Sequence, residues 1–536
     1  MAEADALCRR ILEADPRHAD AWNLRGGIAY RAGRPDVAAE MFGRAVALDG
    51  KVALYHYNFG NALARLGRLD DAVTSYERAV ALAPDHAGAL INLGGVLLGL
   101  GRFDAAALRL RRAVVLAPDR SEPHANLGLA LLRRGDTEAA VECFEAALAL
   151  APDNPGAHAN LGSAKQQQGQ LEPALTHFER GMALAPGEAG IHTNRGNVLQ
   201  MLGRLDEAAT AHRRALALRP DFADAEHNLA TVLLADGRYE EGWPAYESRW
   251  RTGQQADERR DFRQPQWRGE TGRGGTLLIH AEQGLGDTLQ FCRYAPLAAA
   301  KGWRVVLEAP APLVGLLGSL DGVAQVVPPG RPLPPFDAHC PMLSLPLALG
   351  TTLSSIPAAI PYLRAAPQLE LIWRERLGSI AGEAPRIGLA WAGNPNLGNG
   401  PVIDRWRSMA PDLLAPLFAF DGIAFFSLQK GGPKAPARAP IFDVMDQVDD
   451  FADTAALVAN LDLVITVDTA IVHLAGALGK PVWLLDRFSP CWRWLRNRED
   501  SPWYPTLRLF RQTRLGDWPP VVERVGAALA AWAADR

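Results

Sequence analysis

The sequence has very little lysine. Lysine occupies six positions against fifty arginines, and these positions are Lys51, Lys165, Lys301, Lys430, Lys434 and Lys480. The basic total of 56 side chains lies below the acidic total of 60, which leaves a net charge of −4. A general nucleic-acid binder needs a basic surplus to neutralise phosphates, so we expect no nucleic-acid partner.

Long apolar runs and paired cysteines are also missing. No stretch approaches 18 uncharged apolar residues, so we expect no transmembrane segment. The chain starts MAEADALCRR, which is acidic where a signal peptide would be basic. The cysteines lack a CxxC pair, which predicts reduced thiols and neither a disulfide framework nor a zinc site. They are Cys8, Cys143, Cys292, Cys340 and Cys491. We therefore expect a soluble, cytoplasmic protein.

The first half of the chain is an internal repeat with a period of 34 residues. One glycine series is Gly26, Gly60, Gly94, Gly128, Gly162 and Gly196, and a second, seven residues on, runs from Gly33 to Gly237. Alanines and prolines recur in the same phase. This matches the tetratricopeptide pattern, in which the second glycine forms the turn between two helices. We expect an all-α superhelix over residues 1–251, with six good repeats and a degenerate seventh.

An asparagine series follows the same period, at Asn58, Asn92, Asn126, Asn160, Asn194 and Asn228. On the first helix of each repeat, this position is expected to face the concave groove. A ladder of amides there would bind an extended peptide backbone without reading its sequence. The alternative is that these asparagines hold neighbouring repeats together. The pattern favours neither interpretation.

The second half of the chain predicts an α/β module. After a polar, arginine-rich linker at 252–274, apolar strands alternate with helical stretches, as in an open parallel sheet. The expected strands are 276–280, 304–309, 386–393, 425–429, 461–468 and 481–486. They divide into two Rossmann-like halves, 275–370 and 371–536, with a cleft between them.

Three short segments carry a resemblance to known enzymes. HAEQGLGDTLQFCRY (280–294) resembles the N-terminal glycine-rich loop of ADP-heptose:lipopolysaccharide heptosyltransferases, and ITVDTAIVHLAGALGKPVW (465–483) resembles their donor-phosphate motif. SLQKG (427–431) lies where related enzymes contact the donor. Asparagine-laddered repeats joined to such a module resemble the plan of O-GlcNAc transferase. The whole chain resembles bacterial tetratricopeptide-repeat glycosyltransferases, which implies the GT-B fold, a nucleotide-sugar co-substrate, and neither a cofactor nor a catalytic metal.

The turn after the first strand contains Gly284, Gly286 and Asp287. Glycines at a strand-to-helix turn let backbone N–H groups approach an oxyanion or a sugar. Leu289 stands where a dinucleotide-binding GxGxxG motif needs its third glycine, which disfavours an NAD site. Asp287 is the candidate general base for an acceptor hydroxyl. Its alternative role is to cap the helix.

The second motif contains Asp468, Thr469, Ala470 and His473. A helix N-terminus with the Thr469 hydroxyl is suited to a pyrophosphate. Ala470 replaces the glycine of the heptosyltransferase motif, which bears on how closely a phosphate approaches the backbone. The alternative for His473 is a histidine packed beneath the sheet.

Cationic and amide candidates follow two other strands. Lys430 is suited to neutralise a departing nucleotide diphosphate, and Gln429 beside it to contact the nucleoside. The alternative for Lys430 is a solvated loop position. Arg405 and Arg407 are further phosphate candidates or surface arginines. The segment with arginines 487, 493, 496 and 498 among tryptophans is better explained as an interdomain segment than as a nucleic-acid stack.

These features predict an inverting, metal-independent glycosyltransferase whose repeats deliver a protein or peptide acceptor. No DxD motif that would hold a divalent metal against a diphosphate is found in a cleft loop. Two other interpretations stay open. One is a non-catalytic scaffold with a degenerate sugar-nucleotide-binding domain. The other is a glycan-modifying or lipopolysaccharide-type transferase whose repeats recruit partners.

Overall fold

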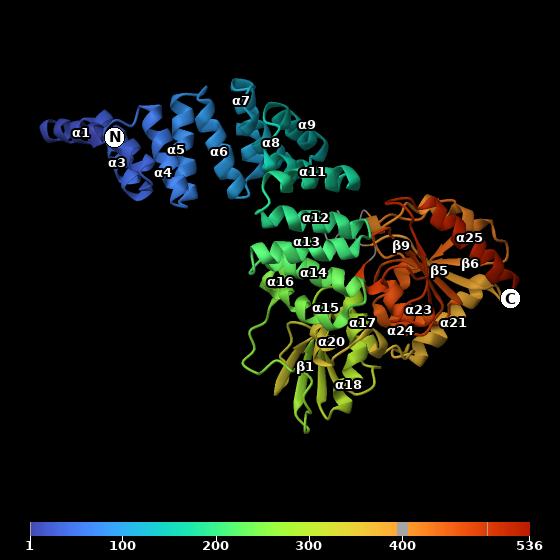
Figure 1. The fold of residues 1–536 in the computed structure, drawn as a ribbon. Helices are drawn as coiled ribbons and strands as arrows, with labels where there is room; N and C mark the ends of the chain where they lie inside the picture. Colours follow the sequence, from blue (N-terminus) through green and yellow to red (C-terminus); the bar gives the residue numbers. More distant parts are fainter. Residues whose placement is uncertain (1, 394–405, 490, 536) are drawn as a thin grey trace. The chain divides into compact units, whose positions relative to one another are not determined.

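The structure, a computed structural model, describes residues 2–393, 406–489 and 491–535. The chain forms two compact units, one ending at Asn194 and the other beginning at Arg195. The N-terminal unit is all helical, and its antiparallel helix pairs stack side by side (Figure 1). The second unit holds the last helices of the array and an α/β module with two parallel sheets. The predicted fold class is confirmed.

The repeats consist of helix pairs preceded by a single helix, α1 (Ala2–Ala14). The pairs are α2 (Ala19–Arg31) and α3 (Pro35–Leu48), α4 (Ala53–Arg65) and α5 (Leu69–Leu82), α6 (Ala87–Gly99) and α7 (Phe103–Leu116), α8 (Ser121–Arg134) and α9 (Thr137–Leu150), α10 (Pro155–Gln167) and α11 (Leu171–Leu184), α12 (Ala189–Met201) and α13 (Leu205–Leu218), and α14 (Ala223–Ala235) and α15 (Tyr239–Tyr246). All seven turn glycines, from Gly33 to Gly237, have positive φ between 71° and 90°. Only glycine adopts this conformation without strain, which explains the second glycine series.

The first glycine series is explained by packing within each repeat. A Cβ built on Gly60 would lie 2.7 Å from the ring of Tyr76, and one built on Gly128 would lie 2.7 Å from the ring of Phe144. The same relationship, with the large side chain sixteen residues after the glycine, joins Gly26 to Phe42, Gly94 to Leu110, Gly162 to Phe178 and Gly196 to His212. The glycine lets the second helix place a large side chain directly against the backbone of the first, which offsets its low helix propensity.

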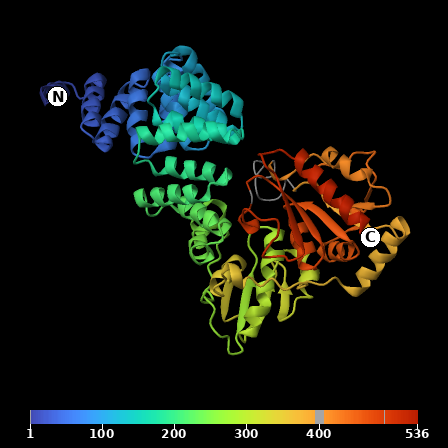
Figure 2. The same cartoon turned by 45° about the vertical axis from the view of Figure 1, so that its right-hand side comes forward.

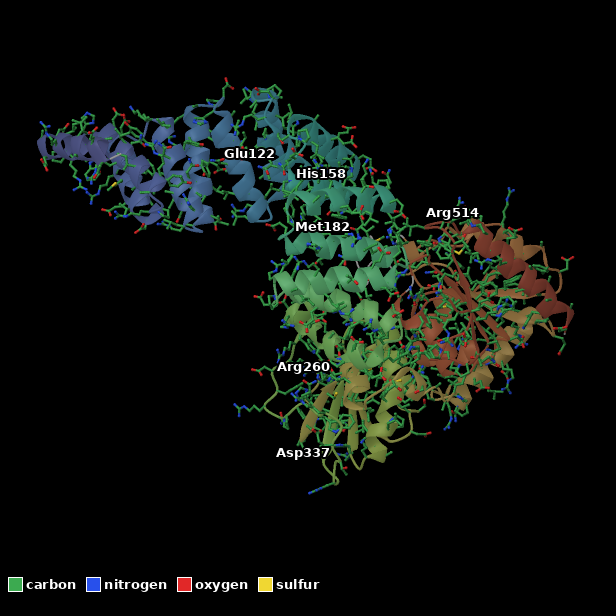
Figure 3. The ribbon with its side chains drawn as sticks, in the orientation of Figure 1. Glu122, His158, Met182, Arg260, Asp337 and Arg514 are labelled. Carbon is green, nitrogen blue, oxygen red and sulfur yellow. The ribbon has the colours of Figure 1, made fainter. Side chains whose placement is uncertain are left out.

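The first parallel sheet has the strand order β3-β2-β1-β4. Its strands are β1 (Thr276–His280), β2 (Arg304–Glu308), β3 (Val323–Val327) and β4 (Ala338–Pro341). Arg260, which pairs with Glu308 at the end of β2, and Asp337, whose carboxylate accepts the N–H of Thr276, lie at opposite ends of this sheet (Figure 3). The sheet is flanked by α17 (Leu285–Phe291), α18 (Ala295–Ala300), α19 (Val314–Leu317) and α20 (Leu345–Ala348).

The second parallel sheet has the strand order β10-β9-β8-β5-β6-β7. Its strands are β5 (Arg386–Ala390), β6 (Ala424–Ser427), β7 (Ile441–Asp443), β8 (Leu463–Val467), β9 (Val482–Asp486) and β10 (Leu507–Arg511). Numbered in chain order within the sheet, this is 6-5-4-1-2-3, the doubly wound arrangement of nucleotide-binding folds. Helices α21 (Pro367–Ala381), α23 (Phe451–Ala459), α24 (Ala470–Ala477) and α25 (Pro519–Ala534) accompany it.

The core of the second sheet fixes its strand ends in place. Ile387, Ile465 and Leu485 from neighbouring strands are nearly or fully buried in one apolar cluster that also includes Val521 and Leu529 of α25. Figure 2 shows α25 lying across one face of this sheet. Since both faces are covered, the strands are continuous apolar runs, and polar side chains are left at the strand ends.

Aromatic side chains join the last repeat to both halves of the α/β module. Trp243 of α15 packs edge-on against Phe291 of α17 and against Trp492, with ring centroids 6.3 and 5.4 Å apart. Tyr239 of the same helix lies 6.3 Å from Trp503. Trp243 and Trp503 are almost completely buried. The end of the array therefore shares one hydrophobic core with the module.

The segment 252–274, expected to be a linker, also contacts the first sheet. It begins with α16 (Gly253–Glu258). Further on, Gln266 forms a β-bridge with His339 of β4. Trp267 is 2% exposed, and its backbone N–H donates to the His339 carbonyl at 2.7 Å. The second part of this segment is thus attached along β4.

Candidate functional site at the carboxyl edge of the second sheet

The parallel strands of the second sheet bring several predicted site residues to one edge. Gln429 and Lys430 follow β6, and Asp468 follows β8. The strand order reverses direction between β5 and β8, which lie side by side. In open parallel sheets, ligands bind outside the carboxyl ends of the strands at this reversal. Three of the predicted site residues, Gln429, Lys430 and Asp468, therefore lie at the edge where this topology favours ligand binding.

Thr469 caps the helix that follows β8. Its hydroxyl accepts the N–H of Ile471 at 3.3 Å, and it lies 3.4 Å from the hydroxyl of Thr466. Asp468 and Ala470 on either side are half-buried. The N–H groups of the first turn of α24 thus point to the carboxyl edge, where the helix dipole favours an anion.

His473 is a buried side chain that contacts aromatic rings. Its Nδ1 lies 3.0 Å from the hydroxyl of Tyr504, and its ring stacks on Trp494 with centroids 5.4 Å apart. Burial holds the pKa of His473 well below its usual value, with a smaller contribution from Arg493 and Arg293. The geometry corresponds to the alternative interpretation, a neutral histidine packed in the interior.

Gly286 lies against the same histidine. A Cβ on Gly286 would be 2.9 Å from His473 Cδ2 and 3.6 Å from the Cα of Ala470. Helices α17 and α24 therefore pack directly on one another, and Gly286 permits the close approach. The structure thus brings together the two motifs that were recognised separately in the sequence.

Asp287 uses both carboxylate oxygens. Oδ2 accepts the N–H of Gly284 at 2.9 Å, which caps α17, and Oδ1 pairs with the guanidinium of Arg493. The Asp287 side chain is 18% exposed. Arg493 also donates to Gln290 at 2.7 Å, so it links the second half of the module to the first. The sequence indicates this arginine only as part of an interdomain segment, and its pairing with Asp287 was not predicted.

Gln429 and Lys430 both bind backbone groups. The Gln429 amide oxygen accepts the N–H groups of Trp391 and Ala392, at 3.2 and 2.9 Å, and its nitrogen donates to Gly431. The ammonium of Lys430 donates to the carbonyl of Val448 at 2.6 Å, although the side chain is exposed. Gln429 thereby fixes the backbone that leaves β5.

The structure describes one of the two remaining arginine candidates, Arg407. Arg405 lies outside the described residues. Arg407 is half-buried, and the backbone beside it is tied to β5, because the Ser408 hydroxyl accepts the N–H of Gly393 at 3.0 Å.

A buried salt bridge at the edge of the first sheet was missed. Arg249, just after α15 in the 3-10 helix η1 (Glu247–Arg251), donates to both carboxylate oxygens of Glu282 at 2.8 Å. Arg249 also donates to Ser344 at 2.8 Å, and Glu282 accepts the N–H of Leu343. The end of the repeat array is thereby bonded to the segments that follow β1 and β4. The sequence signal was an arginine within a run of aromatic residues at the end of the degenerate repeat.

The asparagine series divides into two groups. Asn58 donates to Asn23 at 2.9 Å, Asn92 to Asn61 at 2.7 Å, and Asn228 to Asn197 at 2.9 Å. These bonds join neighbouring repeats. Within the described chain, the side chains of three others make no hydrogen bond, and they are half-buried: Asn126, Asn160 and Asn194. Their preceding repeats carry Gly95, Leu129 and Ser163 where Asn61 and Asn197 serve as acceptors.

Two features are absent from the residues that the structure describes. No group of three or more His, Cys, Asp or Glu side chains among them is arranged to hold a metal ion. None of the helices described is long and apolar enough to cross a membrane.

Comparison with known proteins agrees with these two modules. Tetratricopeptide repeat families match residues 2–53, 57–121, 119–187 and 193–258. The family "Glycosyltransferase family 9 (heptosyltransferase)" matches residues 448–485, which run from before α23 to the end of β9. The chain thus joins a tetratricopeptide array to an α/β module that is similar to a glycosyltransferase.

Particular relatives are similar to parts of the chain. Protein FlbA of Caulobacter vibrioides is 30% identical over 322 residues, which are 55% of this chain and 52% of FlbA, so the chain spans about half the length of that relative. The structure of MamA from Desulfovibrio magneticus RS-1 is 27% identical, covering 31% of this chain and 94% of MamA, with a TM-score of 0.30. TTC0263, a thermophilic repeat protein of Thermus thermophilus, is 25% identical, covering 34% and 100%, with a TM-score of 0.31.

Proposed function

We propose that the protein is an inverting, metal-independent glycosyltransferase of GT-B type that takes a nucleotide sugar as donor. The main support for the proposal is that the strand order and the family match both indicate β8 and α24. The strand order reverses between β5 and β8, and open parallel sheets bind their ligands outside the carboxyl ends at such a reversal. The match to family 9 glycosyltransferases covers the same strand and helix.

The donor would bind with its diphosphate at the first turn of α24. The helix dipole and the Thr469 hydroxyl both suit an anion at this point. Lys430 contributes a cation at the same edge, and two of its three ammonium donors are left after its bond to Val448. Gln429 would act indirectly, by holding the backbone after β5.

In the reaction, the acceptor oxygen forms a bond to the anomeric carbon while the bond from that carbon to the diphosphate breaks. The acceptor proton passes to a base, and the diphosphate leaves with the bonding electrons. Asp287 is the proposed base, because it is a partly exposed carboxylate on α17, the helix that packs against α24. Arg493 and the Gly284 N–H would fix its orientation.

The acceptor would be a protein segment bound by the repeats. Three consecutive asparagines with unbonded amides, Asn126, Asn160 and Asn194, offer donors and acceptors to an extended backbone. Asn58, Asn92 and Asn228 already bond to the preceding repeat, so they would contribute less to peptide binding.

A panel of nucleotide sugars tests the proposal directly. One donor is expected to raise the melting temperature of the full chain, because a ligand that binds only the folded state stabilises it. The same donor should release its nucleoside diphosphate, and release should persist in excess EDTA. Release that stops with chelation and returns with Mn²⁺ would contradict the metal-free mechanism. No thermal shift with any donor would favour the non-catalytic scaffold.

A further inference from the structure

Four arginines lie between β9 and β10, and three of them form ion pairs or hydrogen bonds. Arg493 pairs with Asp287 and Gln290, Arg496 donates to Asp236 at 2.9 Å and to the carbonyl of Gly203, and Arg498 forms a two-pronged pair with Asp500. Arg487 is the exception. It makes no ion pair or hydrogen bond within the described residues, and its Nε is nevertheless buried.

Arg487 lies at the same edge of the second sheet as the proposed diphosphate site. In the parallel pairing of β8 with β9, Val467 lies opposite Leu485. Arg487 follows the last residue of β9, and Thr469, the cap of α24, comes two residues after the end of β8, so both lie at the carboxyl edge of neighbouring strands. Neighbouring strands are about 4.8 Å apart, so the guanidinium starts one strand away from the crevice.

The local charges leave Arg487 available to an external anion. Asp486 immediately before it is completely buried, but its Oδ2 accepts a hydrogen bond from Arg511 at 2.8 Å. Its Oδ1 is buried without a hydrogen-bond partner in the described chain, and the ion pair of this carboxylate is with Arg511 and not with Arg487. Gln512, which is 3% exposed and follows Arg511 on the neighbouring strand, has an amide nitrogen that is also buried without a hydrogen-bond partner in the described chain. Two buried donors thus lie unsatisfied at adjacent strand ends, and such groups ordinarily have a partner.

We propose that Arg487 binds the diphosphate of the nucleotide-sugar donor, together with the first turn of α24. This assignment rests on the proposed function, since it presupposes a nucleotide donor at this edge. A guanidinium presents a planar fork that binds two phosphate oxygens at once, which an ammonium cannot do. When the anomeric carbon–oxygen bond breaks, the electron pair moves onto the diphosphate oxygen. Arg487 stabilises the negative charge that develops there, and it neither gains nor loses a proton.

The test is calorimetric titration of the full chain with UDP, GDP, ADP, CDP and dTDP and with the matching nucleosides. For the diphosphate that wild type binds, Arg487→Ala should weaken affinity by roughly 10- to 100-fold, the range for losing hydrogen bonds to a charged group. Arg487→Lys should recover part of that loss. Affinity for the matching nucleoside should stay unchanged, since it has no phosphate. Arg498→Ala is the matched control, because it removes an arginine of the same segment whose one ion pair among the described residues is with Asp500.

The outcomes separate this assignment from the function on which it rests. If wild type binds a diphosphate and Arg487→Ala binds it equally well, Arg487 is not the phosphate ligand, while the proposed function stands. If Arg487→Ala weakens the nucleoside as much as the diphosphate, its effect is structural and the assignment fails. If wild type binds no member of the panel, both proposals are overturned. Melting temperatures within a few degrees of wild type would show that the variants are folded.

Discussion

Arg249 and Glu282 form a two-pronged salt bridge at 2.8 Å, with side chains 0% and 4% exposed. One residue belongs to the end of the repeat array and the other to the loop after the first strand of the α/β module. Burying two charges is costly unless their hydrogen bonds are satisfied. Here Ser344, Glu247 and the N–H of Leu343 supply further hydrogen bonds. The pair therefore fixes the junction in one geometry.

Arg249→Met should lower the free energy of unfolding of the second unit by about 3–5 kcal/mol, because it leaves the Glu282 carboxylate buried without its partner. Arg213→Ala is the control, since it breaks an exposed pair with Glu241 and should cost less than about 1 kcal/mol. Denaturant titration followed by tryptophan fluorescence measures both. Equal effects for the two variants would mean that the buried pair contributes no more than a surface pair.

Two adjacent glycines of α6 should respond in opposite directions to alanine. Gly94→Ala places a Cβ 2.4 Å from Leu110 Cγ and should destabilise the array by about 1–3 kcal/mol through overpacking. Gly95→Ala meets nothing within 4 Å and should stabilise by about 0.5–1 kcal/mol through higher helix propensity. Thermal unfolding followed by circular dichroism at 222 nm measures the difference. A tolerated Gly94→Ala would remove the packing explanation of the glycine series.

His212→Phe should stabilise the protein and reduce its sensitivity to acid. His212 occupies the position held by Phe144 and Phe178 in earlier repeats, and both ring nitrogens are buried without a hydrogen bond in the described chain. Burial lowers the pKa of His212 from 6.5 to about 4. The neutral histidine is therefore favoured in the folded state above pH 6.5, and this contribution is lost as the pH falls toward 4.

The size of this effect is up to about 3 kcal/mol across the window from pH 6.5 to pH 4. The measurement is the free energy of unfolding against pH for wild type and His212→Phe, with the difference between the two curves isolating this residue. Parallel curves over that window would show that the histidine is not titrating in the interior.

Replacing Asn126, Asn160 and Asn194 together by alanine should weaken binding of a protein acceptor by roughly 10-fold or more, at about 0.5–1.5 kcal/mol for each lost hydrogen bond. Donor hydrolysis without acceptor should be unchanged. The matched variant is Asn58→Ala with Asn92→Ala, which removes bonds between repeats and should lower the melting temperature instead. If the triple variant is folded and its KM for the acceptor is unchanged, the asparagines do not bind the acceptor. The repeats would then be inferred to recruit partner proteins.

Asp287→Asn should lower turnover by about 10²- to 10⁴-fold while donor affinity is kept, because the amide still accepts the Gly284 N–H but cannot take the acceptor proton. Asp500→Asn is the control, since that carboxylate is exposed and pairs only with Arg498. Single-turnover transfer beside donor binding measures the effect. Near-wild-type turnover in a folded Asp287→Asn would reduce the role of Asp287 to capping α17 and pairing with Arg493.

The helical repeats could be predicted from the sequence because the same glycine positions recur in every repeat. Turn glycines such as Gly67 are needed for a positive φ, and packing glycines such as Gly60 are needed for close contact with a large side chain. Both positions are repeated every 34 residues. The strand predicted at 276–280 coincides with β1, because a buried parallel strand is a continuous apolar run. The four strands at the sheet edges, β3, β4, β7 and β10, were not predicted. Strands β3 and β7 are short and partly exposed, while β4 lies in a proline-rich stretch of the sequence that showed no strand pattern.

The sequence predicted the motifs of the candidate site one by one, but not the contacts between them. The pattern of Asp287 at a turn and Thr469 before a helix predicted which residues lie at the carboxyl edges of strands. It contained nothing about the contact of Gly286 with His473 or the pairing of Asp287 with Arg493, which lies 206 residues away in the chain. Such contacts depend on how two sheets pack, and neither local propensity nor periodicity encodes that arrangement in a readable form.

The last repeat carries the aromatic and buried ionic side chains that attach the array to the module: Tyr239, Trp243 and Arg249. The repeat before it adds a further contact, because the Gly203 carbonyl accepts a hydrogen bond from Arg496, and the earlier repeats contact chiefly their immediate neighbours, as in other stacked arrays. A gene encoding this chain can therefore gain or lose whole 34-residue copies upstream while keeping this attachment. The number of copies sets the length of the proposed acceptor-binding array, while the final copy packs as part of the α/β module. Transplanting a different array onto this module would require keeping that copy in place.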